Sequence, residues 1–194
     1  MNFIFLSSKT INNKMIKNKR VLFLLNWMLI FVLSILVRLP NFLSKNFFFD
    51  GDEAIIGIMA QDLLNGENFP LYFYGQNYGF STIEVFSTAF FEAILGASIW
   101  SLKLGGLLIF SLGVTIVYKT IQQYQLKKWM IFLLILLLVT FPSWYLWGTK
   151  VRGGYVTAFL FVCLIFYIIF KKQKSKSDLF FLCVSTVVTY ESHF

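Results

Sequence analysis

Residues 21–40 have the sequence VLFLLNWMLIFVLSILVRLP, an apolar run with a single charged residue near its end. A helix needs about 20 mostly apolar residues to cross the hydrocarbon core of a bilayer. We therefore predict a transmembrane helix at 21–39, ended by Pro40, which cannot donate a backbone hydrogen bond. No small-residue cleavage site follows this run, so we predict an uncleaved first span rather than a secretory signal.

The chain as a whole is too apolar for a water-soluble domain. Of its 194 residues, 58% are hydrophobic and 13% are charged, whereas soluble domains carry about 25% charged residues. The sequence thus predicts an all-α, polytopic transmembrane protein with one membrane domain. The further predicted spans are 99–118, 129–146, 155–170 and, incomplete at the end of the sequence, 179–194.

The basic residues are gathered beside the predicted spans. Twelve of the 17 Lys and Arg residues lie in three short clusters, within 1–20, 119–128 and 171–176. Cytoplasmic loops of membrane proteins are enriched in Lys and Arg, so we place these clusters and the N-terminal tail in the cytoplasm. A nucleic-acid surface is the competing interpretation of basic runs. Because each cluster is short and adjoins an apolar segment, we favour cytoplasmic loops and expect no nucleic-acid partner.

The segment 82–96 has two possible placements. It is about 15 residues long and contains Glu84 and Glu92, and a carboxylate at mid-bilayer costs about 3 kcal/mol. If 82–96 lies along the membrane surface as an amphipathic helix, all three basic clusters are cytoplasmic. If it crosses the bilayer, the second and third clusters lie outside. The positive-inside rule favours the surface placement, which makes 40–98 one outer loop.

Seven of the nine acidic residues of the chain lie in this predicted outer loop. The motif FFFDGDEA at 47–54 places three carboxylates, Asp50, Asp52 and Glu53, within four positions. Apolar residues then recur every fourth position, which predicts a short amphipathic helix near 52–65. One acidic residue at a helix start caps free N–H groups. Three adjacent carboxylates repel one another and indicate a bound cation, a basic ligand or proton transfer.

Aromatic and amide side chains follow in the segment FPLYFYGQNYGF at 69–80. Such a stretch is typical of the aromatic belt at a membrane interface. The alternative is a sugar site, because aromatic rings cover the apolar faces of a sugar and amides bond its hydroxyl groups. The candidates for these contacts are Tyr74, Gln76 and Tyr78.

A short basic stretch, KVRGGY at 150–155, is predicted to lie on the same outer face. Lys and Arg at the end of a span commonly anchor it by extending to the lipid headgroups. Arg152 also offers a fork of N–H donors that suits phosphate oxygens, and Lys150 adds a second positive charge. An acidic loop and a small basic turn are therefore expected on one side of the membrane.

Taken in order, these motifs resemble the beginning of the GT-C glycosyltransferases. The resemblance covers about residues 20–170 and is to the dolichyl-phosphate-mannose protein mannosyltransferase and aminoarabinose transferase group. It implies two short helices in the first outer loop. The motifs that carry it are RLP at 38–40, DGDEA at 50–54, Gly66, FP at 69–70, YGQ at 74–76, YG at 78–79 and RGGY at 152–155.

The resemblance implies an inverting enzyme that transfers a sugar from a polyprenyl-phosphate donor to a protein or glycan acceptor on the outer face. It implies that Asp52 is the general base and that Glu53 orients the acceptor or Asp52. Asp50 would assist, and whether it binds a divalent cation, Mg²⁺ or Mn²⁺, stays open. Arg152 and, less directly, Lys150 would stabilise the lipid-phosphate leaving group.

Members of this family are usually more than twice as long as this chain, so we expect a fragment of an enzyme or a truncated product. One alternative function is a non-catalytic membrane remnant or an assembly partner of a larger transferase. Another is a transporter or polymerase of lipid-linked glycans, in which Glu84 and Glu92 would be transport carboxylates. The gathering of the acidic residues in one outer segment favours the transferase. Without a targeting signal, the expected location is a bacterial inner membrane.

Overall fold

The computed structural model describes the backbone of residues 2–44, 49–67, 71–77 and 79–193, and side chains within these ranges from residue 18 to residue 192. The named elements in this part of the chain are all α-helices. Its β-structure is confined to an isolated bridge between Tyr72 and Phe80. The prediction of an all-α chain is confirmed for the described residues.

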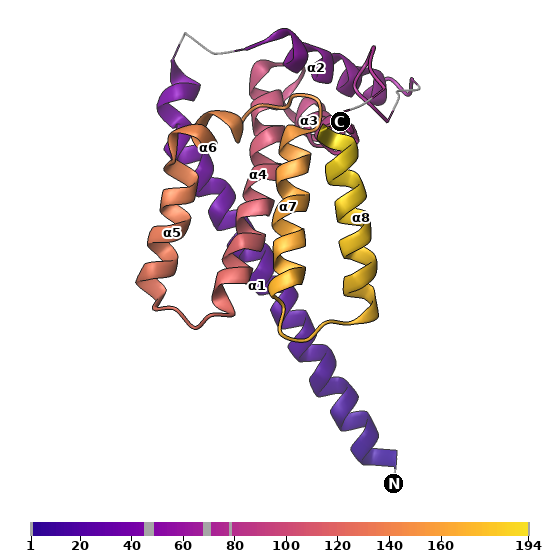
Figure 1. Ribbon diagram of the computed structural model, residues 1–194, viewed down its shortest axis with the longest axis vertical. Helices are drawn as coiled ribbons and strands as arrows, with labels where there is room; N and C mark the ends of the chain where they lie inside the picture. The colour runs from indigo at the N-terminus through magenta and orange to yellow at the C-terminus, as the bar shows by residue number, and fades with distance from the viewer. Residues whose placement is uncertain (1, 45–48, 68–70, 78, 194) are drawn as a thin grey trace.

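Most of the helices run lengthwise through the molecule, and the shorter ones gather at one end (Figure 1). The lengthwise helices are α1 (Asn2–Leu43), α4 (Ile99–Gln122), α5 (Lys128–Thr140), α7 (Tyr155–Phe170) and α8 (Lys176–His193). The shorter ones are α2 (Gly51–Leu64), α3 (Thr82–Leu95) and α6 (Pro142–Trp147). We call their end the α2 end. The opposite end, where the α4–α5 and α7–α8 connections carry the lysine clusters of 119–128 and 171–176, is the lysine-loop end.

Helix α4 is the centre of the packing, and two glycines let its neighbours approach closely. A Cβ atom at Gly105 would lie 2.9 Å from the backbone nitrogen of Thr88 in α3. One at Gly113 would lie 2.6 Å from the Phe159 ring of α7. Small residues at helix contacts are typical of membrane bundles, where close backbone approach replaces the hydrophobic driving force. A larger side chain at Gly105 would push α3 away from α4, and one at Gly113 would displace the Phe159 ring.

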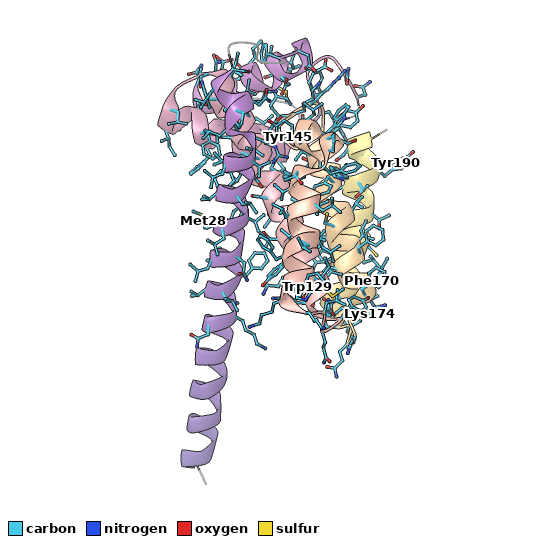
Figure 2. All side chains as sticks on the ribbon, turned by 90° about the vertical axis from the view of Figure 1, so that its left-hand side faces the viewer. Met28, Trp129, Tyr145, Phe170, Lys174 and Tyr190 are labelled. Carbon is cyan, nitrogen blue, oxygen red and sulfur yellow. The ribbon has the colours of Figure 1, made fainter. Side chains whose placement is uncertain are left out.

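Two described helical segments are long and apolar enough to cross a bilayer, Asn18–Leu43 within α1 and Ile99–Gln122, while α5 and α7 are apolar but shorter. Large apolar side chains are exposed along the outer faces of the bundle, with Leu29 at 68% and Phe180 at 65%. Figure 2 shows the labelled Met28 projecting away from the bundle, with Tyr145 and Tyr190 near the α2 end and Trp129, Phe170 and Lys174 near the lysine-loop end.

Two prolines act differently from the sequence-based expectation. Helix α1 continues through Pro40 to Leu43, and the Ser44 N–H closes its end on the Pro40 carbonyl at 3.1 Å. A proline this close to a helix end removes one hydrogen bond without preventing a further turn. Pro142 instead divides the predicted span 129–146 into α5 and α6. Phe141 before it has an extended ψ of 130°, as expected for the residue preceding a proline.

The sequence predicted that 82–96 is a helix along the membrane surface. In the structure this segment is helix α3, and its two glutamates are buried in the protein. At 14 residues it is about 21 Å long, shorter than the roughly 30 Å hydrocarbon core. It packs between α2 and α4 at the α2 end. Glu84 is fully buried and Glu92 is 6% exposed, so both glutamates face the protein interior.

Arg38, near the end of α1, is also fully buried. Its guanidinium donates to the carbonyls of Trp144 at 2.6 Å and Tyr145 at 3.0 Å, both in α6, and to the Ser34 carbonyl at 3.2 Å. Its Cζ lies 5.1 Å from the centre of the Phe110 ring. These carbonyls and rings replace the carboxylate partner that a buried arginine usually requires, and they fix α1 to α6.

Candidate functional site

Two segments a hundred residues apart meet at the α2 end, namely the start of α2 and the turn 148–154 between α6 and α7 (Figure 1). Arg152 Nε lies 2.6 Å from Asp52 Oδ2, and Lys150 Nζ lies 3.2 Å from Asp50 Oδ2. Arg152 Nη1 is 3.7 Å from the same Asp50 oxygen, which links the two pairs. The structure thus brings four of the sequence-predicted site residues into one network, which we call the ionic cluster.

Within the ionic cluster, Asp50 and Asp52 have different surroundings. Asp50 is the N-cap of α2, because its Oδ1 accepts the Glu53 N–H at 3.1 Å. Burial alone would raise its pKa, but that hydrogen bond and the nearby Lys150 ammonium together hold the pKa below its usual value. The Asp52 side chain is 40% exposed and the Arg152 side chain 38%. Asp52 is therefore the more exposed of the two aspartates, since the Asp50 side chain is 24% exposed.

Glu53 faces the other way from Asp52, into the protein. Its Oε1 lies 2.5 Å from Nζ of Lys103 in α4, and both side chains are buried. Its second oxygen, Oε2, is buried without a hydrogen-bond partner among the described residues. Burial raises the pKa of Glu53, although Lys103 opposes the shift. Glu53 therefore anchors α2 on α4, which positions Asp52 one residue before it.

A small polar pocket of about 220 Å³ lies beside the ionic cluster. It joins five parts of the chain: the start of α2, the loop after residue 71, the turn before α7, the start of α7 and the end of α8. The lining residues are Asp52, Phe73, Gln76, Arg152, Gly153, Tyr155 and Ser192. The pocket thus holds a carboxylate, a guanidinium, an amide and two aromatic rings within reach of one another.

The three predicted sugar contacts have three different outcomes. Gln76 lines the pocket. The Tyr74 hydroxyl instead donates to Asp62 Oδ2 at 2.7 Å, which raises the pKa of Tyr74 to about 12 and ties the loop to α2. Tyr78 lies outside the described residues. The sequence analysis assigned no sugar contact to Phe73 or Tyr155, because aromatic residues are too frequent in this chain to mark one position.

Glu84 is a component of the site that the sequence did not reveal. Its carboxylate accepts the backbone N–H groups of Gly154 at 3.2 Å, Val156 at 3.1 Å and Thr157 at 3.2 Å. It therefore caps α7 from another helix and holds the end of the turn that carries Arg152. The available signal was the pair of glycines before α7, which supply no capping side chain of their own. The Gly154 N–H already donates a hydrogen bond to Glu84, so it is not available to bind a phosphate group.

The two buried glutamates of α3 make stability depend on pH. Burial raises the pKa of Glu84 and of Glu92 from 4.5 to about 7, although hydrogen bonds to Glu84 oppose the shift there. The Glu92 Oε2 atom is buried without a hydrogen-bond partner among the described residues. Because the folded chain holds protons that the unfolded chain releases, stability falls as the pH rises from about 4.5 to 7.

We expect Glu92→Gln to raise the melting temperature at pH 8 and to change it little at pH 5. A pKa of about 7 in place of 4.5 corresponds to about 3 kcal/mol of lost stability at high pH, which the neutral amide does not incur. Thermal unfolding in detergent at both pH values measures this. The control is Glu67→Gln, which changes an exposed glutamate. If the melting temperatures of Glu92→Gln and the wild type changed equally with pH, the raised pKa of Glu92 would be contradicted.

Comparison of the chain with protein-family models, with curated proteins and with solved structures finds no match in any of the three. The described residues define an all-helical protein with an ionic cluster and a small polar pocket at one end of its bundle.

Proposed function

We propose that this chain is part of a polytopic membrane glycosyltransferase of the GT-C type, which moves a sugar from a polyprenyl phosphate to an acceptor at the outer face of a bacterial inner membrane. The observation that carries the proposal is the ionic cluster beside the polar pocket at the α2 end. The motif order described above, and the location of the lysine clusters of 119–128 and 171–176 at the end of the bundle opposite the ionic cluster, also support it.

In this proposal the lengthwise helices cross the bilayer, with the lysine-loop end in the cytoplasm and the α2 end outside. Lys-rich connections at one end follow the positive-inside rule. The exposed apolar side chains of α1, α5 and α8 then face lipid rather than water. In this orientation the α2 end, with its carboxylates, is accessible to an acceptor on the extracytoplasmic side of the membrane.

Cysteine labelling in intact cells tests this orientation. We expect Asn77→Cys, near the polar pocket, to react with a membrane-impermeant maleimide, and Lys174→Cys to react only after the membrane is opened. Both changes are made after Cys163 and Cys183 are replaced by serine. Asn77 and Lys174 are both exposed, so failure to react reflects location. Labelling of Lys174→Cys in intact cells would reverse the proposed orientation.

The chemistry assigned to the site is a displacement at the anomeric carbon of the donor. The acceptor hydroxyl oxygen attacks that carbon, its proton passes to Asp52, and the bond between the carbon and the phosphate oxygen breaks. The leaving polyprenyl phosphate keeps the electron pair, and the positive charges of Arg152 and Lys150 stabilise it. In this proposal Gln76 and the rings of Phe73 and Tyr155, which line the polar pocket, contact the sugar. The pocket is smaller than sites of about 300–1,000 Å³ for drug-sized ligands, which suits a single sugar.

A divalent cation fits the ionic cluster poorly. Asp50 Oδ1 already accepts the Glu53 N–H, and Oδ2 faces the cations of Lys150 and Arg152 at 3.2 and 3.7 Å. A second positive ion at that oxygen would meet strong repulsion. We therefore derive no step through Mg²⁺ or Mn²⁺.

Deletion of the gene from its source organism tests the transferase assignment. Lipid extracts of the deletion strain should accumulate a polyprenyl-phosphate sugar, because the donor is no longer consumed, and the full native reading frame should reverse this. Arg152→Gln should support transfer about a hundredfold less well, the usual effect of removing one group that stabilises a developing negative charge. Lys174→Gln, a charge loss at the other end, is the matched control. An unchanged pool of lipid-linked sugar after deletion would exclude the assignment.

A further inference from the structure

A second cavity lies away from the ionic cluster, towards the lysine-loop end. Helices α1, α4 and α5 form a groove of about 440 Å³. Asn26, Tyr118, Gln122 and Lys128 line one part of it, beside the α4–α5 connection. The apolar part is lined chiefly by side chains of α1 and α5, including Leu29, Leu33, Ile131 and Ile135.

The lining changes from polar to apolar along the helix axes. Both α1 and α5 run from the lysine-loop end towards the α2 end (Figure 1). From Asn26 to Leu33, and from Lys128 to Ile135, each helix advances seven residues, or about 10 Å. The groove is therefore polar at the membrane surface and apolar deeper in. A lipid has the same distribution, with a headgroup at the surface and an acyl chain below it.

The polar part of the groove is positively charged. Lys128 lines it, Lys127 precedes it in sequence, and Lys119 donates to Gln122 at 3.3 Å. The sequence contains no Asp or Glu between residues 1 and 49 or between 93 and 177. The three helices that form the groove consequently have no carboxylate to neutralise these cations. The charge at the mouth of the groove is complementary to an anionic headgroup.

Asn26 supplies an independent indication that a hydrogen-bond acceptor binds in the groove. It lines the groove, and its Nδ2 amide is buried without a hydrogen-bond partner among the described residues. Leaving a buried donor unpaired is costly, and such groups usually have a partner. A rotation of the Asn26 side chain towards the groove would let a phosphate or ester oxygen of a lipid accept this hydrogen bond. Free phosphate would leave the apolar part of the groove unfilled.

We propose that this groove is a binding site for an anionic phospholipid of the inner leaflet, with its headgroup at Lys128 and Asn26 and an acyl chain between α1 and α5. Basic pockets between membrane helices bind such headgroups on the cytoplasmic side. The inference requires the proposed membrane orientation but not the sugar transfer. It therefore stands or falls separately from the role of the ionic cluster.

Native mass spectrometry of the full chain in detergent tests the site. The protein is titrated with dioleoyl phosphatidylglycerol and, separately, with dioleoyl phosphatidylcholine. We expect the wild type to bind phosphatidylglycerol about fivefold more tightly, the usual contribution of one basic residue near an anionic lipid surface. Lys128→Gln should lose this preference, whereas Asn26→Leu should weaken the binding of both lipids, because both carry the phosphate and ester oxygens that accept from Asn26. Lys174→Gln, which removes an equal charge from the other lysine loop, should keep it.

A groove-filling variant separates lipid binding in the groove from charge attraction elsewhere. Leu29 lines the groove and is largely exposed, so Leu29→Trp should fold, block the acyl-chain position and reduce tight binding of both lipids. Circular dichroism confirms the helix content of each variant. Equal binding of the two lipids by the wild type would overturn the proposal. Undiminished phosphatidylglycerol binding by Leu29→Trp would also overturn it, whether or not Lys128→Gln folds.

Discussion

Replacement of Asp52 by Asn is expected to lower sugar transfer about a thousandfold while the protein stays folded and inserted. A positioned general base contributes roughly 10²–10⁴ in rate, and an amide cannot accept the acceptor's proton. The substitution preserves shape, and the side chain is 40% exposed, so its structural cost is small. The rate is measured with the full native protein in membranes, with a radiolabelled polyprenyl-phosphate sugar as donor.

The division between kcat and KM distinguishes a base from a residue that only orients its neighbours. Loss of the proton acceptor lowers kcat. Asp52→Asn also removes the negative partner of Arg152, 2.6 Å away, which frees that cation for the donor phosphate. The KM for the donor should therefore not rise. Glu67→Gln, in the same loop but exposed and outside the ionic cluster, is the matched control. If Asp52→Asn transferred sugar at a rate within threefold of the wild type, Asp52 would not be the general base.

Replacement of Lys103 by Met is expected to destabilise the protein by about 3–5 kcal/mol. The change leaves the Glu53 carboxylate buried without its partner at 2.5 Å, and breaking a buried ion pair at one side has this typical cost. For a chain of this size the melting temperature should fall by roughly 10 °C. Thermal unfolding in detergent, followed by circular dichroism at neutral pH, measures the loss.

A second substitution shows whether the loss comes from the stranded charge. In Lys103→Met/Glu53→Leu both charges are replaced by apolar groups, which is often neutral for a buried pair. We expect the double variant to recover most of the lost stability. A double variant as unstable as Lys103→Met would mean that Lys103 acts through packing alone. A stable Lys103→Met single variant would show that the pair contributes nothing to the fold.

The sequence pattern predicted the helical class of the chain and the location of its acidic loop and basic turn at the same end of the molecule. Long apolar runs require helices, because only helices satisfy their own backbone in lipid. Counting spans and charges placed Lys150 and Arg152 on the same side as Asp50 and Asp52, but their direct contacts are a finding of the structure. The predicted features depend on amino-acid composition and on the local order of residues, which can be read from a single sequence.

Partners that depend on packing could not be predicted in this way. Glu84 caps α7, some seventy residues away in sequence, and a glutamate in an amphipathic stretch does not indicate which helix end it will reach. Lys103 lies near the start of the predicted span 99–118, and a buried lysine requires an acidic partner. Identification of Glu53 as that partner required the rotation of α2 about its axis, which a short amphipathic pattern does not determine.

The contacts of Arg38 also bear on how the protein is made. Its carbonyl acceptors in α6 are translated more than a hundred residues after it, an interval of about 5–20 s at ribosomal rates. During this time the guanidinium must be solvated by water or by lipid headgroups, since burial without acceptors is too costly. In the proposed membrane orientation, the outer end of the first helix therefore stays at the membrane surface until α6 has emerged from the ribosome.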